Sequence, residues 1–68
     1  MEIRIELNGQ SRALPRGSTL GTLIEELGLA PESVAAEVNR ELVARARRDR
    51  TVLVEGDRVE IVTLVGGG

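Results

Sequence analysis

The first fifteen residues carry the pattern that most restricts the fold. Residues 2–7 alternate strictly between charged and aliphatic side chains, which predicts a β-strand with one buried face. Asn8-Gly9 follows at once, and this dipeptide readily supplies the two positive φ values of a type I′ turn. The partner strand then covers about residues 10–14, and a two-residue loop places Leu14 on the buried face. The chain therefore begins with a hairpin that needs a hydrophobic cover.

A short amphipathic helix is the expected cover. Pro15 interrupts the second strand, and Ser18 or Thr19 can cap a helix by accepting a backbone N–H bond. Gly28 suits the left-handed conformation that ends helices. Between them lies one apolar stripe at helical spacing, formed by Leu20, Leu23, Ile24 and Leu27. The sequence predicts one main helix over about residues 19–28, packed across the sheet.

The second half of the chain has a weaker pattern. Residues 34–38 alternate, residues 39–40 suit a turn, and residues 42–43 can continue as a short strand. Residues 45–51 are expected to be irregular or one helical turn, whereas residues 59–65 are the most β-prone run. This order predicts an α+β domain with a mixed sheet of four to five strands. In such domains the two end strands commonly pair in parallel at the centre.

Composition excludes most kinds of enzyme. The chain has 68 residues without cysteine, histidine or any aromatic residue, and all nine of its basic residues are arginine. A conventional general base or covalent nucleophile is therefore nearly absent, and so is a thiolate metal site. We expect one small aliphatic domain over residues 1–65 that is not an enzyme and binds no metal or cofactor itself.

Charge and hydropathy restrict the environment and the partners. A formal net charge of −2 argues against nucleic-acid binding. The one basic run contains Arg45, Arg47, Arg48 and Arg50. It is interrupted by Asp49 and is expected to be a solvated surface segment, with a docking patch as the alternative. Because no apolar stretch is long enough for a membrane span, no signal peptide is evident, and the lack of cysteine fits a reducing compartment, we expect a cytoplasmic protein without membrane contacts.

The last three residues are the chemical feature of the chain. Folding alone gives no reason for Gly66, Gly67 and Gly68, and a frayed end is one interpretation. The other is functional, because a chain without side chains can enter a slot too narrow for a Cβ atom. The α-carboxylate of Gly68 is then the one group that an enzyme could convert into a reactive acyl species.

These residues resemble the ThiS family of small sulfur carriers in thiamine thiazole biosynthesis. The Gly56-Asp57 turn, the apolar strand after it and the terminal Val-Gly-Gly-Gly are specific together. The wider match comprises residues 7–9, 14–20, 23–27, 38–39, 45, 51–53, 56–62 and 64–68. The sequence departs from the family pattern at Ala44, Ala46 and Arg48, which concerns partner contacts more than chemistry.

The resemblance implies a fold and a mechanism. It implies a β-grasp (ubiquitin-like) domain over residues 1–65 and a flexible tail over residues 66–68 that enters the active sites of partner enzymes. A ThiF-type adenylyltransferase, using ATP and Mg²⁺, would join the Gly68 carboxylate to AMP. A cysteine-derived persulfide would then convert Gly68 to a thiocarboxylate. A ThiG-type thiazole synthase would take that sulfur for the thiazole ring.

A docking patch next to the tail follows from strand alternation. If Val59 and Ile61 face the helix, Glu60, Val62 and Leu64 lie on the opposite side of the strand. The two aliphatic side chains are then either an exposed patch leading to the tail or covered by residues 42–53. Both arrangements agree with the sequence.

Two other functions use the same pattern. A ubiquitin-like protein modifier, or a sulfur carrier for molybdopterin or tRNA thiolation, would need the same activated tail. A simple interaction module with an incidental glycine end is the remaining possibility. The family resemblance favours the thiamine carrier.

Overall fold

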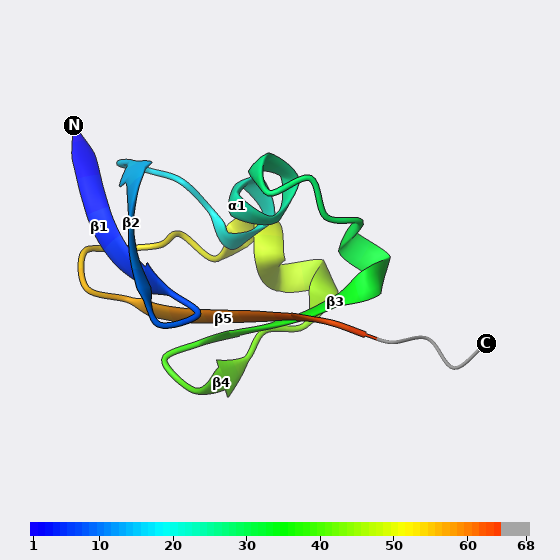
Figure 1. The fold of residues 1–68 in the computed structure, drawn as a ribbon. Helices are drawn as coiled ribbons and strands as arrows, with labels where there is room; N and C mark the ends of the chain where they lie inside the picture. Colours follow the sequence, from blue (N-terminus) through cyan, green and yellow to red (C-terminus); the bar gives the residue numbers. More distant parts are fainter. Residues whose placement is uncertain (65–68) are drawn as a thin grey trace.

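The computed structural model describes residues 1–64, which form a five-stranded mixed sheet with one main helix across it (Figure 1). The strands lie in the order β2-β1-β5-β3-β4. In chain order the elements are β1 (Glu2–Leu7), β2 (Gln10–Pro15), α1 (Leu20–Glu26), the 3-10 helix η1 (Pro31–Ser33), β3 (Val34–Val38), β4 (Glu41–Leu42), the 3-10 helix η2 (Arg45–Arg50) and β5 (Arg58–Thr63). The expected α+β architecture is confirmed.

The two ends of the chain meet at the centre of the sheet. β1 pairs with β2 in antiparallel fashion with Leu7 opposite Gln10, as the two-residue turn predicts. β1 also pairs with β5 in parallel, with Leu7 beside Val59. β3 pairs antiparallel with the other side of β5. The central parallel pair therefore joins the first strand to the last one.

Both hairpin turns use the left-handed backbone region. Asn8 and Gly9 have φ values of 49° and 84°, which confirms the type of turn that the dipeptide indicates. Asn39 and Arg40 have φ values of 52° and 71° in the turn between β3 and β4. Asparagine tolerates this region better than most residues because its short side chain can bond locally. The second turn therefore repeats the first without a glycine.

The helix is shorter than the sequence pattern suggests. α1 covers Leu20–Glu26 rather than residues 19–28, because Thr19 is its N-cap and Leu27 its C-cap. The Thr19 hydroxyl accepts from the Thr22 amide at 3.1 Å, and the Thr22 hydroxyl accepts from the Thr19 amide at 2.9 Å. Gly28 has a φ value of 72°, as expected for the residue that ends a helix.

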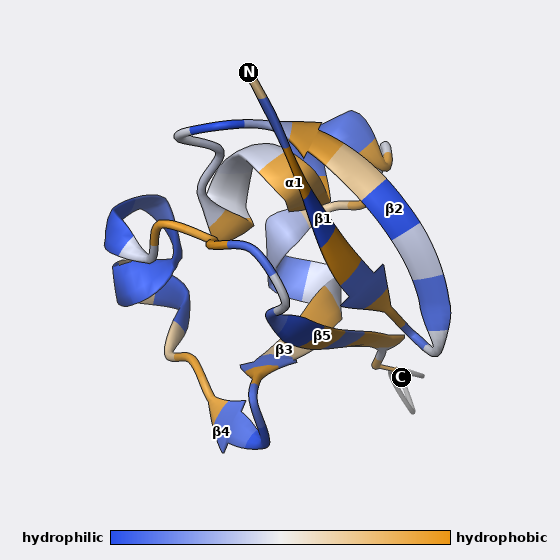
Figure 2. Cartoon of the chain, turned by 90° about the vertical axis from the view of Figure 1, so that its left-hand side faces the viewer, coloured by the Kyte–Doolittle hydropathy of each residue, from blue (hydrophilic) through white to orange (hydrophobic). Residues whose placement is uncertain are grey.

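The core is entirely aliphatic and lies between α1 and one face of the sheet. Figure 2 shows alternating polar and hydrophobic segments along β1, so one side of the strand enters the core and the other faces outward. The buried side chains are Ile3, Ile5, Leu14, Leu20, Leu23, Ile24, Val34, Ala36, Leu53, Val59 and Ile61. The predicted apolar stripe of the helix packs here, except for Leu27, which is only partly buried.

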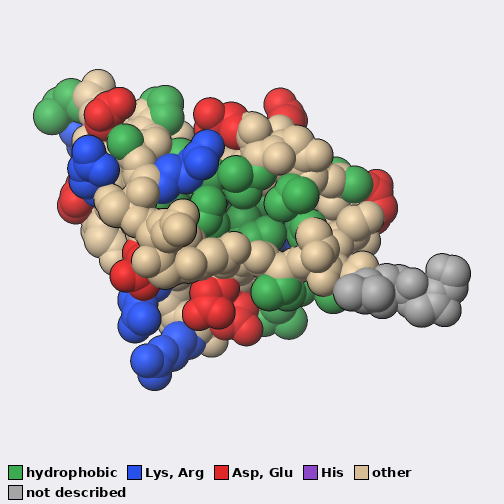
Figure 3. Space-filling model, viewed as in Figure 1, with side chains coloured by type: hydrophobic (Ala, Val, Ile, Leu, Met, Phe, Trp, Pro, Cys, Tyr) green, Lys and Arg blue, Asp and Glu red, His purple; other side chains and the backbone are tan. Residues whose placement is uncertain are grey.

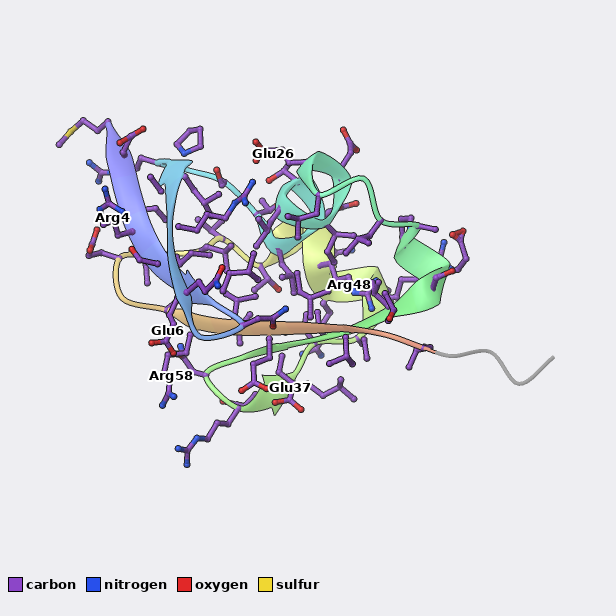
Figure 4. All side chains as sticks on the ribbon, viewed as in Figure 1. Arg4, Glu6, Glu26, Glu37, Arg48 and Arg58 are labelled. Atoms are coloured by element: carbon purple, nitrogen blue, oxygen red, sulfur yellow. The ribbon has the colours of Figure 1, made fainter. Side chains whose placement is uncertain are left out.

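The expectation of a solvated arginine run is wrong for Arg48. Its side chain is only 6% exposed, and its guanidinium donates to the carbonyl oxygens of Pro31 at 2.8 Å and Val34 at 2.7 Å. The aliphatic stem of an arginine can pack against apolar surface while the guanidinium bonds elsewhere. Arg48 thus ties η2 to the beginning of β3 (Figure 4).

We expect Arg48→Met to destabilise the domain by about 1–3 kcal/mol, because methionine keeps much of the stem but leaves two carbonyl oxygens without their donors. Urea unfolding measures this free energy, and Arg47→Met is the matched control because Arg47 is exposed. Equal stability of the two variants would show that these hydrogen bonds do not hold β3.

Candidate functional site

The predicted tail residues Gly66, Gly67 and Gly68 lie outside the described residues, so the site is built from the strand that leads to them. β5 crosses the molecule and ends on the side away from Met1 (Figure 1). Just beyond it, the Leu64 amide donates to the Ser33 carbonyl oxygen at 2.7 Å. The point where the chain leaves the domain is therefore fixed by η1.

The side chain of Asn8 extends the pairing between β1 and β5. The backbone amide of Asn8 donates to the Val59 carbonyl oxygen at 2.9 Å. Its side-chain Nδ2 donates to the Ile61 carbonyl oxygen at 3.1 Å, and its Oδ1 accepts from the Ile61 amide at 2.9 Å. The asparagine amide thus supplies the donor and the acceptor of a further backbone residue, and it holds the middle of β5 after β1 has turned away.

A second polar group holds the beginning of β5. The buried carboxylate of Asp57 accepts from the Val54 amide at 2.9 Å and from Asn39 Nδ2 at 3.0 Å. Asn39 Oδ1 in turn accepts from the Arg58 amide at 3.0 Å. The turn between β3 and β4, which contains Asn39, is therefore bonded to the segment that leads into β5. The sequence indicates Asn39 and Asp57 only as turn residues. Their contacts join distant parts of the chain, and no local sequence pattern predicts them.

The structure decides between the two arrangements of the docking patch. Val62 and Leu64 are 54% and 55% exposed, so residues 42–53 do not cover them. Glu60 is exposed as well, while Val59 and Ile61 are buried as the alternation predicts. Figure 3 shows hydrophobic and acidic side chains together on the underside of the sheet, beside the end of the described chain. The structure thus brings together the three docking residues that the sequence predicts.

Other elements extend this surface. Ala35 of β3 lies opposite Val62, and Leu42 of β4 lies opposite Glu37. Leu42 is 71% exposed. We call these outward side chains the docking face, as a candidate partner surface: Ala35, Glu37, Leu42, Glu60, Val62 and Leu64. Sequence reasoning missed the contributions of β3 and β4, because they depend on the register between strands.

Among residues 1–64, two surface hollows lie away from the docking face. One is lined by Met1, Ile3 and Val54 among others, and the second lies between α1 and η2. Across residues 1–64 no group of three or more His, Cys, Asp or Glu side chains is arranged to hold a metal ion. No helix of that part of the chain has the length and hydrophobicity needed to span a bilayer.

Comparison with known proteins gives one consistent family. The ThiS family model matches residues 5–68. The sulfur carrier protein ThiS of Thermus thermophilus is 39% identical over 62 residues, which are 91% of this chain and 95% of that protein. A thiazole synthase of Magnetococcus marinus is 42% identical over 66 residues. That match covers 97% of this chain but only 20% of the synthase.

Among solved structures, the thiamine biosynthesis protein ThiS of Geobacter metallireducens has the same fold. Its TM-score is 0.83 at 29% identity, and the match covers 97% of this chain and all of that one. The expected β-grasp fold is confirmed.

The Asn8 contacts give a test of how β5 is held. Asn8→Asp replaces the Nδ2 donor by an acceptor that faces the Ile61 carbonyl oxygen, so we expect a loss of about 1–3 kcal/mol. Hydrogen exchange at the Ile61 amide should become faster, since this amide bonds to the altered side chain.

Gln10→Glu is the matched control, because it makes the same change from amide to carboxylate at an exposed residue of the same hairpin. If Asn8→Asp leaves both the stability and the Ile61 exchange rate at the control values, the Asn8 side chain does not position β5.

Proposed function

This chain belongs to the ThiS family, and on that basis we propose that it is a sulfur carrier protein for thiamine biosynthesis. Its C-terminal Gly68 carboxylate is adenylated and converted to a thiocarboxylate, which donates sulfur to the thiazole ring. The observation that carries this proposal is the family match itself, because it extends from residue 5 through Gly68.

The geometry of the described part supports a carrier. β5 is held by the side chains of Asn8 and Asn39, and the Leu64 amide just beyond it bonds the Ser33 carbonyl oxygen, so the chain leaves the domain at a defined place. Four extended residues beyond Leu64 span roughly 13 Å. A partner enzyme can therefore hold the domain by its docking face while the Gly68 carboxylate enters its active site. The carrier supplies the acyl group and the partner supplies the catalytic groups.

The proposed conversion of Gly68 to a thiocarboxylate has three steps, two substitutions and one reduction. A Gly68 carboxylate oxygen attacks the α-phosphorus of Mg²⁺-bound ATP, and pyrophosphate leaves. The terminal sulfur of a cysteine persulfide attacks the acyl carbon, and AMP leaves. The resulting acyl disulfide takes two electrons from a thiol, which releases the Gly68 thiocarboxylate. All proton transfers belong to the partner enzymes, since this chain has no side chain with an unperturbed pKa near neutrality.

The proposed reaction requires two partner enzymes and one sulfur donor. The adenylation needs a ThiF-type adenylyltransferase, and the sulfur comes from a cysteine-derived persulfide. A ThiG-type thiazole synthase receives it. The synthase is supported by relatives that are themselves called thiazole synthase and contain a segment similar to this chain over 20% of their length. The exchange of persulfide and thiol requires a reducing compartment, which agrees with a cytoplasmic location.

The proposed reaction predicts a change in the mass of the chain. The chain incubated with its adenylating enzyme, ATP, Mg²⁺ and a persulfide source should gain the difference between one sulfur and one oxygen atom. Deletion of Gly68 should abolish this gain, because the chain would then be one residue too short for the active site. Intact-mass spectrometry measures both. A truncated chain that still gains sulfur would show that the tail assignment is wrong.

Gene disruption distinguishes thiamine synthesis from the other pathways that could use an activated Gly68 carboxylate. Disruption of this gene should cause a growth requirement that the thiazole moiety of thiamine relieves. A defect in molybdenum enzymes or in tRNA thiolation, with normal thiamine synthesis, would contradict the assignment to thiamine.

The docking face can be tested by substitution of its aliphatic side chains. The double variant Val62→Ser, Leu64→Ser should raise the KM for the carrier in the adenylation assay by about tenfold, because about 1.4 kcal/mol of apolar burial at the interface is lost. Its stability should change little, since both side chains are about half exposed. Val52→Ser, also about half exposed but at the far end of the molecule, is the control. Equal KM values for both variants would exclude this patch.

A further inference from the structure

Two carboxylates of the docking face lie directly opposite one another. Glu37 of β3 is the antiparallel partner of Glu60 of β5. Side chains at directly opposite positions have Cβ atoms roughly 5 Å apart, and like charges there destabilise a sheet. Across residues 1–64 neither carboxylate takes part in an ion pair or a side-chain hydrogen bond. The fold therefore carries an electrostatic cost at this point.

The neighbouring charges do not relieve this cost. Arg58 is two residues before Glu60 and points to the same face, but its Nε donates to Glu6 Oε2 of β1 at 3.1 Å. Figure 4 shows this ion pair at one end of the sheet and Glu37 on its underside. The end of the sheet away from the tail is thus neutralised within the chain, whereas the half that leads to the tail keeps two free negative charges.

Apolar side chains surround the acidic pair. Val62 follows Glu60 on the same side of β5, and Leu42 lies opposite Glu37 on β4. Both are more than half exposed. Such a surface suits a partner with a basic side chain surrounded by apolar residues. The basic side chain would neutralise the two carboxylates, and the apolar residues would cover the exposed aliphatic side chains. Positions that violate a local rule of stability are often functional ones.

We propose that the Glu37–Glu60 pair is the recognition element for a basic side chain on the adenylating enzyme, with an arginine as the best fit. This inference rests on the proposed function. An enzyme that binds ATP beside the Gly68 carboxylate must be electropositive around its active site, because both ligands are anionic. The tail spans only roughly 13 Å, so the outward side of β5 that leads to the tail must lie along the enzyme surface beside that electropositive region. A guanidinium can bond both carboxylates at once, since its N–H groups form a planar fork.

The test uses variants that should improve the carrier's own stability. Glu60→Arg converts the like-charge pair into an opposite-charge pair with Glu37, and the variant Glu37→Gln, Glu60→Gln removes the repulsion. Both should raise the urea concentration at the midpoint of unfolding. Loss of function therefore cannot be attributed to misfolding.

With the purified adenylating enzyme, we expect the double Gln variant to raise the KM for the carrier by about tenfold at low salt and by less at high salt, with kcat unchanged. Glu60→Arg should raise KM further. The control is Glu25→Gln, Glu26→Gln, which makes the same change of net charge at two exposed residues of α1. Figure 4 shows Glu26 on the opposite side of the molecule from Glu37. The control should keep the wild-type KM.

Three results would overturn the proposal. Equal KM values for the double Gln variant and the α1 control would show that the pair is outside the interface, or that only net charge matters. A change seen with the thiazole synthase but not with the adenylating enzyme would show that the occupant is a different enzyme. A wild-type chain that is not adenylated at all would reject the proposed function, and this assignment with it.

Discussion

The parallel pairing of β1 with β5 is the interaction on which the rest of the structure depends. It joins the first six-residue strand to the last one, and every other strand is added to one side or the other of this pair. The backbone contact is short, since only Glu6–Arg58 and Leu7–Val59 are paired. The amide of Asn8 lengthens it through Ile61. A buried Asp57 carboxylate secures the beginning of β5. This arrangement fixes both the position and the direction of the strand that leads to Gly68.

The same arrangement explains why so simple a composition is sufficient. The core needs only aliphatic side chains, because one short helix and a five-stranded sheet enclose it. The polar side chains of Asn8, Asp57 and Asn39 hold backbone groups in place. The proposed chemistry takes place at the terminal carboxylate, which no count of side chains includes. The lack of cysteine then has a chemical benefit, since an internal thiol could attack an activated Gly68.

Local features of this fold could be predicted from the sequence and distant ones could not. The hairpin register follows from Asn8-Gly9, and the helix follows from the spacing of its leucines, because each depends on residues within a few positions. Arg48 was expected to be solvated, but its guanidinium bonds the carbonyl oxygens of Pro31 and Val34 far back in the chain.

The candidate site shows the same division. Alternation along β5 correctly separates buried Val59 and Ile61 from outward Glu60 and Val62. It does not say whether another segment covers the outward side, and it does not place Glu37 opposite Glu60. That contact depends on the register between β3 and β5, which is set by the whole sheet.

The central claim is that sulfur is carried on Gly68, and the most direct measurement locates it within the chain. The protein isolated from cells that are making thiamine can be cleaved after Arg58, and the peptide of residues 59–68 can be fragmented in a mass spectrometer. The account predicts that the exchange of one oxygen for one sulfur is present in every fragment that contains Gly68, and in no fragment that lacks it. An unmodified Gly68 throughout, or sulfur on any other residue, would contradict the account.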